Sequence, residues 1–252
     1  GESRIAERLG ELMDRDRPDR GLPLVGTTAS RGVVACRVRH SGPNEAEVVA
    51  ALDAVEDEIN HRLGAAVFDR RDPSTGDSPD VADALPRVVV SMLRDRGERV
   101  AVAESCTAGL LGAEITRIAG SSSVFVGGWL TYSNEMKTLM LGVPVSVLER
   151  EGAVSGACAL AMARGALERS GADHALSITG VAGPGGGSDE KPVGSVWIGY
   201  APPEGNAEAR LFRFKGDRDA VRAWAMRTAL GLLRLRLAGL DMKLLAEIDR
   251  VR

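Results

Sequence analysis

The chain has 252 residues, of which 44% are hydrophobic and 27% are charged, and this is enough for one large core or two small ones. Its formal net charge is -3, with acidic and basic residues mixed throughout, so composition offers no broad basic surface for nucleic acid. The cysteines, Cys36, Cys106 and Cys158, lie far apart and form neither a disulfide framework nor a zinc-binding pair. No apolar run reaches the roughly 20 residues that a membrane span needs. We therefore expect a cytoplasmic protein of two domains with no membrane segment.

Residues 1–68 have the pattern of a small α+β module. Apolar residues at helical spacing open the chain, and the segments LPLVGTT and GVVACRVRH have the composition of strands. A second helix follows, because Asn44 and Glu47 form an N-cap and N3 pair before apolar residues that recur every three or four positions as far as Leu63. Residues 69–80, DRRDPSTGDSPD, contain no apolar residue and predict a linker.

Residues 81–252 alternate between strand and helix patterns, which predicts an α/β domain with a mixed sheet between two layers of helices. The expected elements in chain order are a helix through VVVSMLRDRG, the strand RVAVAE, a helix over 107–118, the strand VFVGGWLTY, helices over 134–141 and 155–170, the strand HALSIT, the antiparallel strands GSVWIGYA and EARLFRF, and a helix over 217–240.

Ser105, Cys106 and Thr107 lie between a buried strand and a helix, where free backbone N–H groups can bind an anion or an oxyanion. In the simplest interpretation Ser105 or Thr107 only caps the helix. Cys106 is an alternative nucleophile, because a helix N-terminus lowers the pKa of a thiol. However, no histidine of this sequence is placed to serve as its base.

The segment TYSNEMK ends the next strand and opens the next helix. It places Tyr132, Asn134 and Lys137 at the same end of the sheet as Ser105 if the two strands are parallel neighbours. Lys137 can act as a base if burial lowers its pKa, and a Ser with a Lys is an established pair of nucleophile and base. The alternative is that Lys137 is an ordinary solvated lysine.

Two further segments point to phosphate. The stretch SITGVAGPGGG, residues 177–187, has the glycine density that lets backbone N–H groups approach a ligand, although it matches neither common phosphate-loop motif. Asp217 is the expected N-cap of the last helix, with Arg218 in its first turn and Arg222 one turn on, and either arginine can pair with a phosphate.

Six segments in this order resemble the C-terminal domain of the competence-damage-inducible CinA family, the nicotinamide mononucleotide deamidases. They are AESCTAGLL, GGWLTYSNEMK, LGVP, GAVS, ITGVAGPGGG and EKPVGSVWIGYA. The resemblance covers about residues 82–245, and residues 1–68 resemble the KH-like middle domain of the long CinA proteins. In those proteins a molybdopterin-binding-like domain with ADP-ribose pyrophosphatase activity comes first. We expect that domain to be missing here and do not assign its activity to this chain.

The resemblance implies hydrolysis of nicotinamide mononucleotide to nicotinic acid mononucleotide and ammonia, without a metal or another cofactor, by a homodimer. It identifies Ser105, Lys137, Tyr132 and Thr179 as catalytic. The expected substrate-binding residues are Glu104, Cys106, Thr107, Ala108, Gly109, Asn134, Gly180, Gly183, Gly185, Gly186, Arg218 and Arg222. Ala108 departs from the family, which has glycine there, and its methyl group narrows the approach of the backbone to a ligand.

Within this constellation we expect the N–H groups of Cys106 and Thr107 to bind the oxyanion. The Tyr132 hydroxyl is expected to hold Lys137 or Ser105 in line, the alternative being a ring that stacks on the pyridinium. Thr179 is expected to bond the lysine or the carboxamide.

A competing interpretation is a catalytically weak, nucleotide-binding or nucleic-acid-associated fragment of a larger CinA protein. Residues 1–68 contain no GxxG clamp loop, and Phe68 is their only aromatic residue, so the sequence argues against RNA as a partner.

Overall fold

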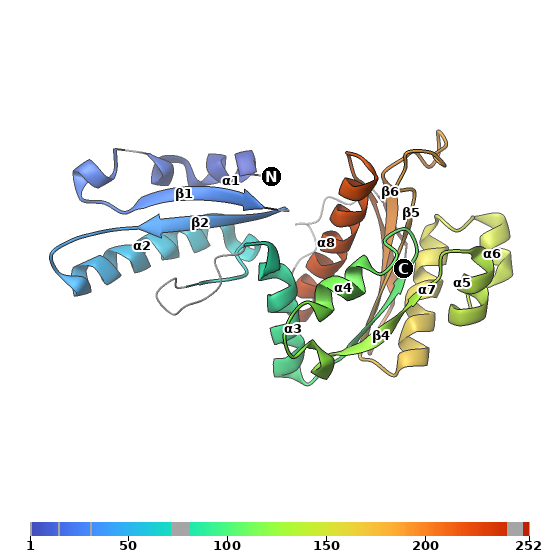
Figure 1. The fold of residues 1–252 in the computed structure, drawn as a ribbon. Helices are drawn as coiled ribbons and strands as arrows, with labels where there is room; N and C mark the ends of the chain where they lie inside the picture. Colours follow the sequence, from blue (N-terminus) through green and yellow to red (C-terminus); the bar gives the residue numbers. More distant parts are fainter. Residues whose placement is uncertain (1, 15, 31, 72–80, 241–248, 252) are drawn as a thin grey trace. The chain divides into compact units, whose positions relative to one another are not determined.

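The computed structural model forms two compact units, residues 1–84 and residues 85–252 (Figure 1). The described residues are 2–14, 16–30, 32–71, 81–240 and 249–251. Of the expected linker, residues 72–80 lie outside the described residues. None of the described helices combines the length and the apolarity that crossing a membrane requires.

Unit 1 contains an antiparallel pair of strands, β1 (Leu24–Ser30) and β2 (Val33–Arg39), with the helices α1 (Glu2–Leu9) and α2 (Glu45–Leu63). The Asn44 side chain caps α2 by accepting from the Ala46 N–H at 3.0 Å, as its sequence position predicts. Two strands alone are marginal, and apolar side chains of the helices stabilise them. This core consists of Leu9, Leu12, Val25, Val55, Ile59 and Leu63.

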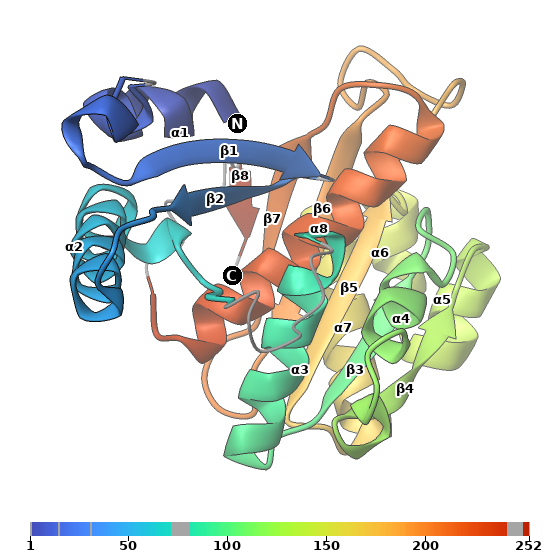
Figure 2. The same ribbon diagram turned by 60° about the vertical axis from the view of Figure 1, so that its left-hand side comes forward.

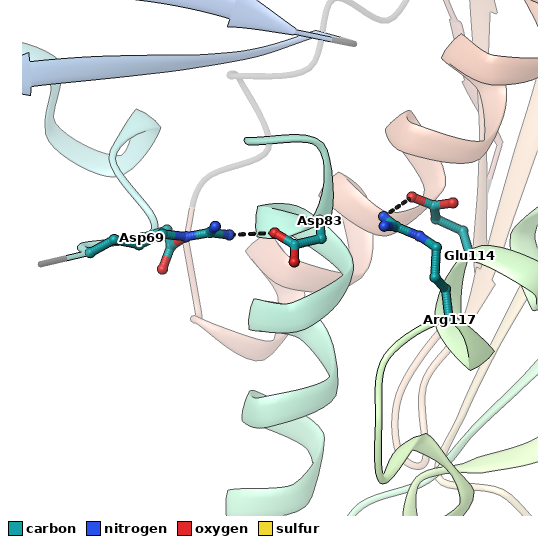
Figure 3. Close-up of polar contacts among 5 residues, drawn as sticks. Asp69, Asp83, Glu114 and Arg117 are labelled. Carbon is teal, nitrogen blue, oxygen red and sulfur yellow. Dashed lines mark hydrogen bonds and ion pairs between the residues drawn. The ribbon is translucent and has the colours of Figure 1, made fainter. Parts of the chain in front are cut away.

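An arginine at the end of unit 1 pairs with two carboxylates (Figure 3). Arg71 contacts Asp69 at 2.9 Å and Asp83 at 2.6 Å, and the side chains are largely buried. The second contact ties the short 3-10 turn η5 (Val81–Asp83) to the segment that follows α2.

Unit 2 has a mixed sheet in the strand order β4-β3-β5-β6-β7-β8. The neighbours β4, β3 and β5 are parallel, and the remaining pairs are antiparallel. The strands are β3 (Val100–Glu104), β4 (Phe125–Leu130), β5 (His174–Gly180), β6 (Ser195–Ala201), β7 (Glu208–Arg213) and β8 (Asp249–Val251), the last of which the sequence pattern does not predict.

Helices cover both faces of this sheet (Figures 1 and 2). On one face α7 packs against β3, β5 and β6, with α5 and α6 beside it, and α3, α4 and α8 lie on the other. The helices are α3 (Ala84–Arg96), α4 (Leu110–Thr116), α5 (Asn134–Leu141), α6 (Val145–Arg150), α7 (Gly156–Ser170) and α8 (Arg218–Leu237). Figure 3 also shows the Glu114–Arg117 ion pair at the end of α4. The three-layer arrangement confirms the predicted fold class.

The parallel half of the sheet decides where polar segments meet. Because β3, β4 and β5 run in one direction, their carboxyl ends lie at the same edge of the sheet. The segments that follow them, beginning at residues 105, 131 and 181, are therefore neighbours. This edge therefore brings together three segments: the turn that begins at residue 105 and holds the expected nucleophile, the start of α5, and the glycine-rich loop.

The close packing of α5 on α7 depends on one glycine. A Cβ at Gly165 in α7 would lie 1.9 Å from the carbonyl oxygen of Leu141, the last residue of α5. No side chain fits at that distance, so glycine is required where the two helices meet.

We predict that Gly165→Ala lowers the free energy of unfolding by about 2 kcal/mol, because overpacking against rigid backbone outweighs the better helix propensity of alanine. Urea unfolding of both proteins measures the difference. An ordinary mid-helix glycine would respond in the opposite direction, so unchanged or increased stability would contradict the packing argument.

Candidate active site

Ser105 follows β3 directly and is held by the neighbouring strand. Its N–H donates to the Ile178 carbonyl of β5 at 2.9 Å, which extends the strand pairing by one residue. Lys137 lies in the first turn of α5, which Ser133 caps by accepting from the Met136 N–H at 3.2 Å. The two side chains meet as the sequence predicts: Lys137 Nζ lies 3.1 Å from Ser105 Oγ.

Lys137 is one of the most deeply buried polar residues in the structure, with 1% of its surface exposed. Its Nζ also donates to the carbonyl oxygens of Thr131 at 2.8 Å and Tyr132 at 3.3 Å. Carbonyls only accept, so they fix two N–H bonds of the amine, while the Ser105 hydroxyl can either accept or donate. Burial lowers the pKa of Lys137. A neutral amine in this position directs its lone pair at the Ser105 proton.

The turn after Ser105 differs from the sequence-based prediction. The predicted helix over 107–118 begins only at Leu110, and residues 105–109 form turns in which Ala108 (φ 50°) and Gly109 (φ 94°) are left-handed. Among the described residues, Ala108 is the only non-glycine residue with positive φ, a conformation that is strained for alanine. At the position where the resemblance implies glycine, Ala108 thus has a backbone conformation that glycine adopts without strain.

Glu104 explains why the helix starts late. Its buried carboxylate accepts from the N–H groups of Gly109 at 3.0 Å, Leu111 at 3.1 Å and Gly112 at 2.9 Å. These are helix-start N–H groups that a serine or threonine cap was expected to satisfy. The interpretation of Ser105 or Thr107 as the cap is wrong, and Glu104, predicted to bind substrate, has its carboxylate occupied by backbone.

Two backbone N–H groups beside Ser105 remain without an acceptor in the described ranges. In the part of the chain that the structure describes, neither the Cys106 N–H nor the Thr107 N–H has a hydrogen-bond acceptor. Thr107 Oγ1 is also buried and has no hydrogen-bond partner among the described residues. These N–H groups start the turn rather than the helix, but they remain candidates for oxyanion binding.

Cys106 does not have the properties of a nucleophile. It is 5% exposed, and burial raises the pKa of its thiol to about 11. Cys106 precedes α4, which begins at Leu110, so it does not lie in the first turn of a helix, and burial is the largest cause of its raised pKa.

Tyr132 points away from the pair that its hydroxyl was expected to hold. Its hydroxyl accepts from Arg218 Nη2 at 3.1 Å, its side chain is largely exposed, and only its backbone carbonyl reaches Lys137. Arg218 Nη1 donates to the Gly183 carbonyl at 2.8 Å. Arg218 therefore links the start of α8, the glycine-rich loop and the tyrosine.

The two arginines of α8 occupy different places. Arg222 Nη2 donates to the Thr107 carbonyl at 2.9 Å, so Arg222 braces the nucleophile turn. Arg218 lies beside the exposed ring of Tyr132 and is the better placed of the two for a ligand phosphate. Asp217 caps α8 by accepting from the Ala220 N–H at 2.9 Å, as predicted.

Thr179 and the glycines divide into structural and open positions. The Thr179 hydroxyl donates to the Ala153 carbonyl at 2.8 Å, and among the described residues it makes no hydrogen bond to Lys137, one of its two expected partners. A bond to the carboxamide, the other expected partner, stays a prediction. A Cβ at Gly180 would lie 2.7 Å from the Ser195 carbonyl oxygen, which explains this glycine by strand packing. By contrast, Gly185 and Gly186 have open space around them.

Asn134 is exposed in the first turn of α5.

Within the described ranges, no group of three or more His, Cys, Asp or Glu side chains is arranged to hold a metal ion.

Two family profiles match this sequence. That of the CinA C-terminal domain matches residues 82–237, and that of the KH domain of damage-inducible protein CinA matches residues 1–68. CinA-like proteins from Synechococcus sp. (strain RCC307) and Geobacter metallireducens are 41% and 40% identical over 94% of this chain. The aligned parts are 53% and 54% of those proteins, so the chain spans about half the length of the curated relatives it matches.

Solved structures match about three fifths of this chain. A competence/damage-inducible protein from Agrobacterium tumefaciens is 44% identical with a TM-score of 0.59, covering 61% of this chain and 93% of that one. A CinA superfamily protein from Klebsiella pneumoniae is 40% identical with a TM-score of 0.59, covering 62% of this chain and 96% of its own.

We predict that iodoacetamide modifies native Cys106 and Cys158 far more slowly than Cys36 at pH 8. Burial raises the pKa of the Cys106 and Cys158 thiols to about 11, so little thiolate forms. Burial also raises the pKa of Cys36, but this thiol is only half-buried, so the reagent can reach it. Peptide mass spectrometry over time measures the three rates, and all three thiols should react in guanidinium chloride. Alkylation of native Cys106 as fast as Cys36 would contradict this picture of the site.

Proposed function

Because the chain belongs to the CinA family, we propose that it hydrolyses the carboxamide of nicotinamide mononucleotide to give nicotinic acid mononucleotide and ammonia. The observation that carries the proposal is the contact of a buried lysine amine with a serine hydroxyl, at 3.1 Å, beside two free backbone N–H groups. This is the minimum set for cleaving an amide without a metal: a nucleophile, a base and oxyanion donors.

In the first half of the reaction Ser105 Oγ attacks the carboxamide carbon while Lys137 Nζ takes the hydroxyl proton. The carbonyl oxygen becomes an oxyanion, which the N–H groups of Cys106 and Thr107 stabilise. The resulting Lys137 ammonium returns the proton to the departing nitrogen, so ammonia leaves and an acyl-serine remains. The carbonyls of Thr131 and Tyr132 keep Nζ in place throughout.

In the second half a water molecule attacks the acyl-serine. Lys137 takes a proton from that water and returns it to Ser105 Oγ as the ester bond breaks, which yields the carboxylic acid and restores the free serine. One residue thus acts as base and then as acid in each half.

The exposed residues at the edge of the site fit the rest of the substrate. The Tyr132 ring offers a face to the positively charged pyridinium, a cation–π contact worth about 1–2 kcal/mol. Arg218 and the open backbone of Gly185 and Gly186 offer charge and N–H donors to the phosphate. Binding of the phosphate by Arg218 would exchange its present hydrogen bonds for charge-assisted ones.

We predict that Ser105→Ala and Lys137→Met each lower kcat for ammonia release from nicotinamide mononucleotide by roughly a thousandfold or more, because members of such a pair fail together. Cys106→Ala is the matched control next to the nucleophile and should stay within about threefold of wild type. The assay measures ammonia, with nicotinamide as the control substrate.

Near-normal turnover by Ser105→Ala together with an inactive Cys106→Ala would show that the nucleophile is misassigned. Wild-type protein that binds the mononucleotide without releasing ammonia would support the competing interpretation, a nucleotide-binding fragment.

We also predict that kcat rises with pH. Lys137 must be neutral to act as base, and burial holds its pKa below its ordinary value of 10.5. Below that lowered pKa the neutral fraction, and with it kcat, grows about tenfold per pH unit, and above it kcat reaches a plateau. A pH–rate profile on protein shown to stay folded across the range measures the inflection. A flat profile, or one that still rises at 10.5, would contradict the role of Lys137.

A further inference from the structure

We infer that Glu104 is a positioning residue, which holds the turn of residues 105–109 in its strained form and so keeps Ser105 against Lys137. The inference rests on the proposed function in one respect, that Ser105 is the nucleophile. It differs from the sequence-based prediction for Glu104, which was substrate binding.

The carboxylate of Glu104 is fully committed to backbone. Glu104 is 1% exposed. Its Oε2 accepts from the N–H groups of Gly109 and Leu111, and its Oε1 accepts from the N–H of Gly112. No ion pair with Glu104 occurs within the described residues, so the N–H groups at the start of α4 are the partners of its carboxylate.

The hydrogen bonds of the Glu104 carboxylate hold both ends of the turn that contains Ser105, the expected nucleophile, and so form a closed loop. Glu104 is the last residue of β3, and its side chain reaches Gly109 at the far end of the turn, so residues 105–108 lie between two fixed points. Within that loop Ala108 is left-handed, a conformation that alanine keeps only when surrounding contacts impose it. The local sequence pattern alone predicts a helix from residue 107. We attribute the different turn that is observed to the carboxylate.

The backbone of Glu104 also reaches the base. The Thr131 N–H donates to the Glu104 carbonyl at 2.9 Å, and the Thr131 carbonyl in turn accepts from Lys137 Nζ at 2.8 Å. One residue thereby connects to both members of the pair, to Ser105 through the turn and to Lys137 through Thr131. Loss of the carboxylate should release the serine while leaving the lysine and its carbonyl partners in place.

Glu104→Gln tests this, because the side chain keeps its size but presents an amide NH₂ to N–H donors. We expect kcat for the mononucleotide to fall at least a hundredfold, KM to stay within threefold, and the pH inflection to stay unchanged because Lys137 is untouched. Glu104→Asp, which keeps the charge but is one methylene too short to reach all three N–H groups, is the second variant in case glutamine prevents folding. It should show the same split between kcat and KM.

Glu208→Gln is the matched control. Glu208 is also a buried carboxylate, but it pairs with Arg210 and Arg236 on β7 and α8, away from the nucleophile turn. We expect this variant to lose stability while its folded fraction keeps wild-type kcat. If it loses as much kcat as Glu104→Gln at the same folded fraction, the effect is general destabilisation and the inference is overturned.

A second readout separates the inference from the proposed function. A small phosphonofluoridate, which attaches to activated serines, should label Ser105 of wild type, and label Glu104→Gln at least tenfold more slowly, as judged by intact-protein mass spectrometry. If wild type labels but releases no ammonia from the mononucleotide, the proposed function fails and the labelling rates still decide the inference. Equal labelling rates, or a wild-type Ser105 that does not label, overturn it.

Discussion

Burial of the Lys137 amine is the constraint on which the rest of the site depends. An ammonium inside a protein is costly unless hydrogen-bonded, and a neutral amine still needs partners for its N–H groups. The chain supplies two as it leaves β4, where the carbonyls of Thr131 and Tyr132 turn toward Nζ. The remaining direction faces Ser105. A lysine in water would be fully protonated at neutral pH, so the same burial that costs stability is what makes this residue a usable base.

The two halves of the mixed sheet position different parts of the site around the buried lysine. Its parallel half brings the segments after β3, β4 and β5 to one edge, and α5 descends from that edge to lie against α7, where Gly165 permits contact with the backbone of Leu141. Its antiparallel half leads to α8, whose Arg222 and Arg218 reach the nucleophile turn and the glycine-rich loop. The serine and lysine come from one half, and the cationic edge of the site from the other.

The fold could be predicted from the sequence by periodicity. The meeting of Ser105 with Lys137 could be predicted from the condition that β3 and β4 are parallel neighbours, together with the resemblance that identified the pair. Sequence reasoning failed where a side chain contacts residues that lie several or many positions away in the sequence. A glutamate at the end of a strand does not resemble a helix cap, yet Glu104 reaches three N–H groups up to eight residues on. The Tyr132 hydroxyl lies far from its own backbone and is directed by Arg218, 86 residues away. Thr179 bonds the Ala153 carbonyl, a contact that no local pattern specifies.

The environment of the site also favours Ser105 over the adjacent Cys106 as the nucleophile of the proposed reaction. A cysteine reacts as the thiolate, so a Cys–Lys pair must first form two separated charges. Burial opposes both: it raises the pKa of Cys106 to about 11 and lowers the pKa of Lys137. Serine needs no prior ionisation, because its proton moves to the base only as the new bond to carbon forms. At that moment the charge appears on the substrate oxygen, beside the free N–H groups of Cys106 and Thr107. In the proposed reaction a buried, neutral lysine therefore favours Ser105, and Cys106 contributes its backbone N–H rather than its sulfur.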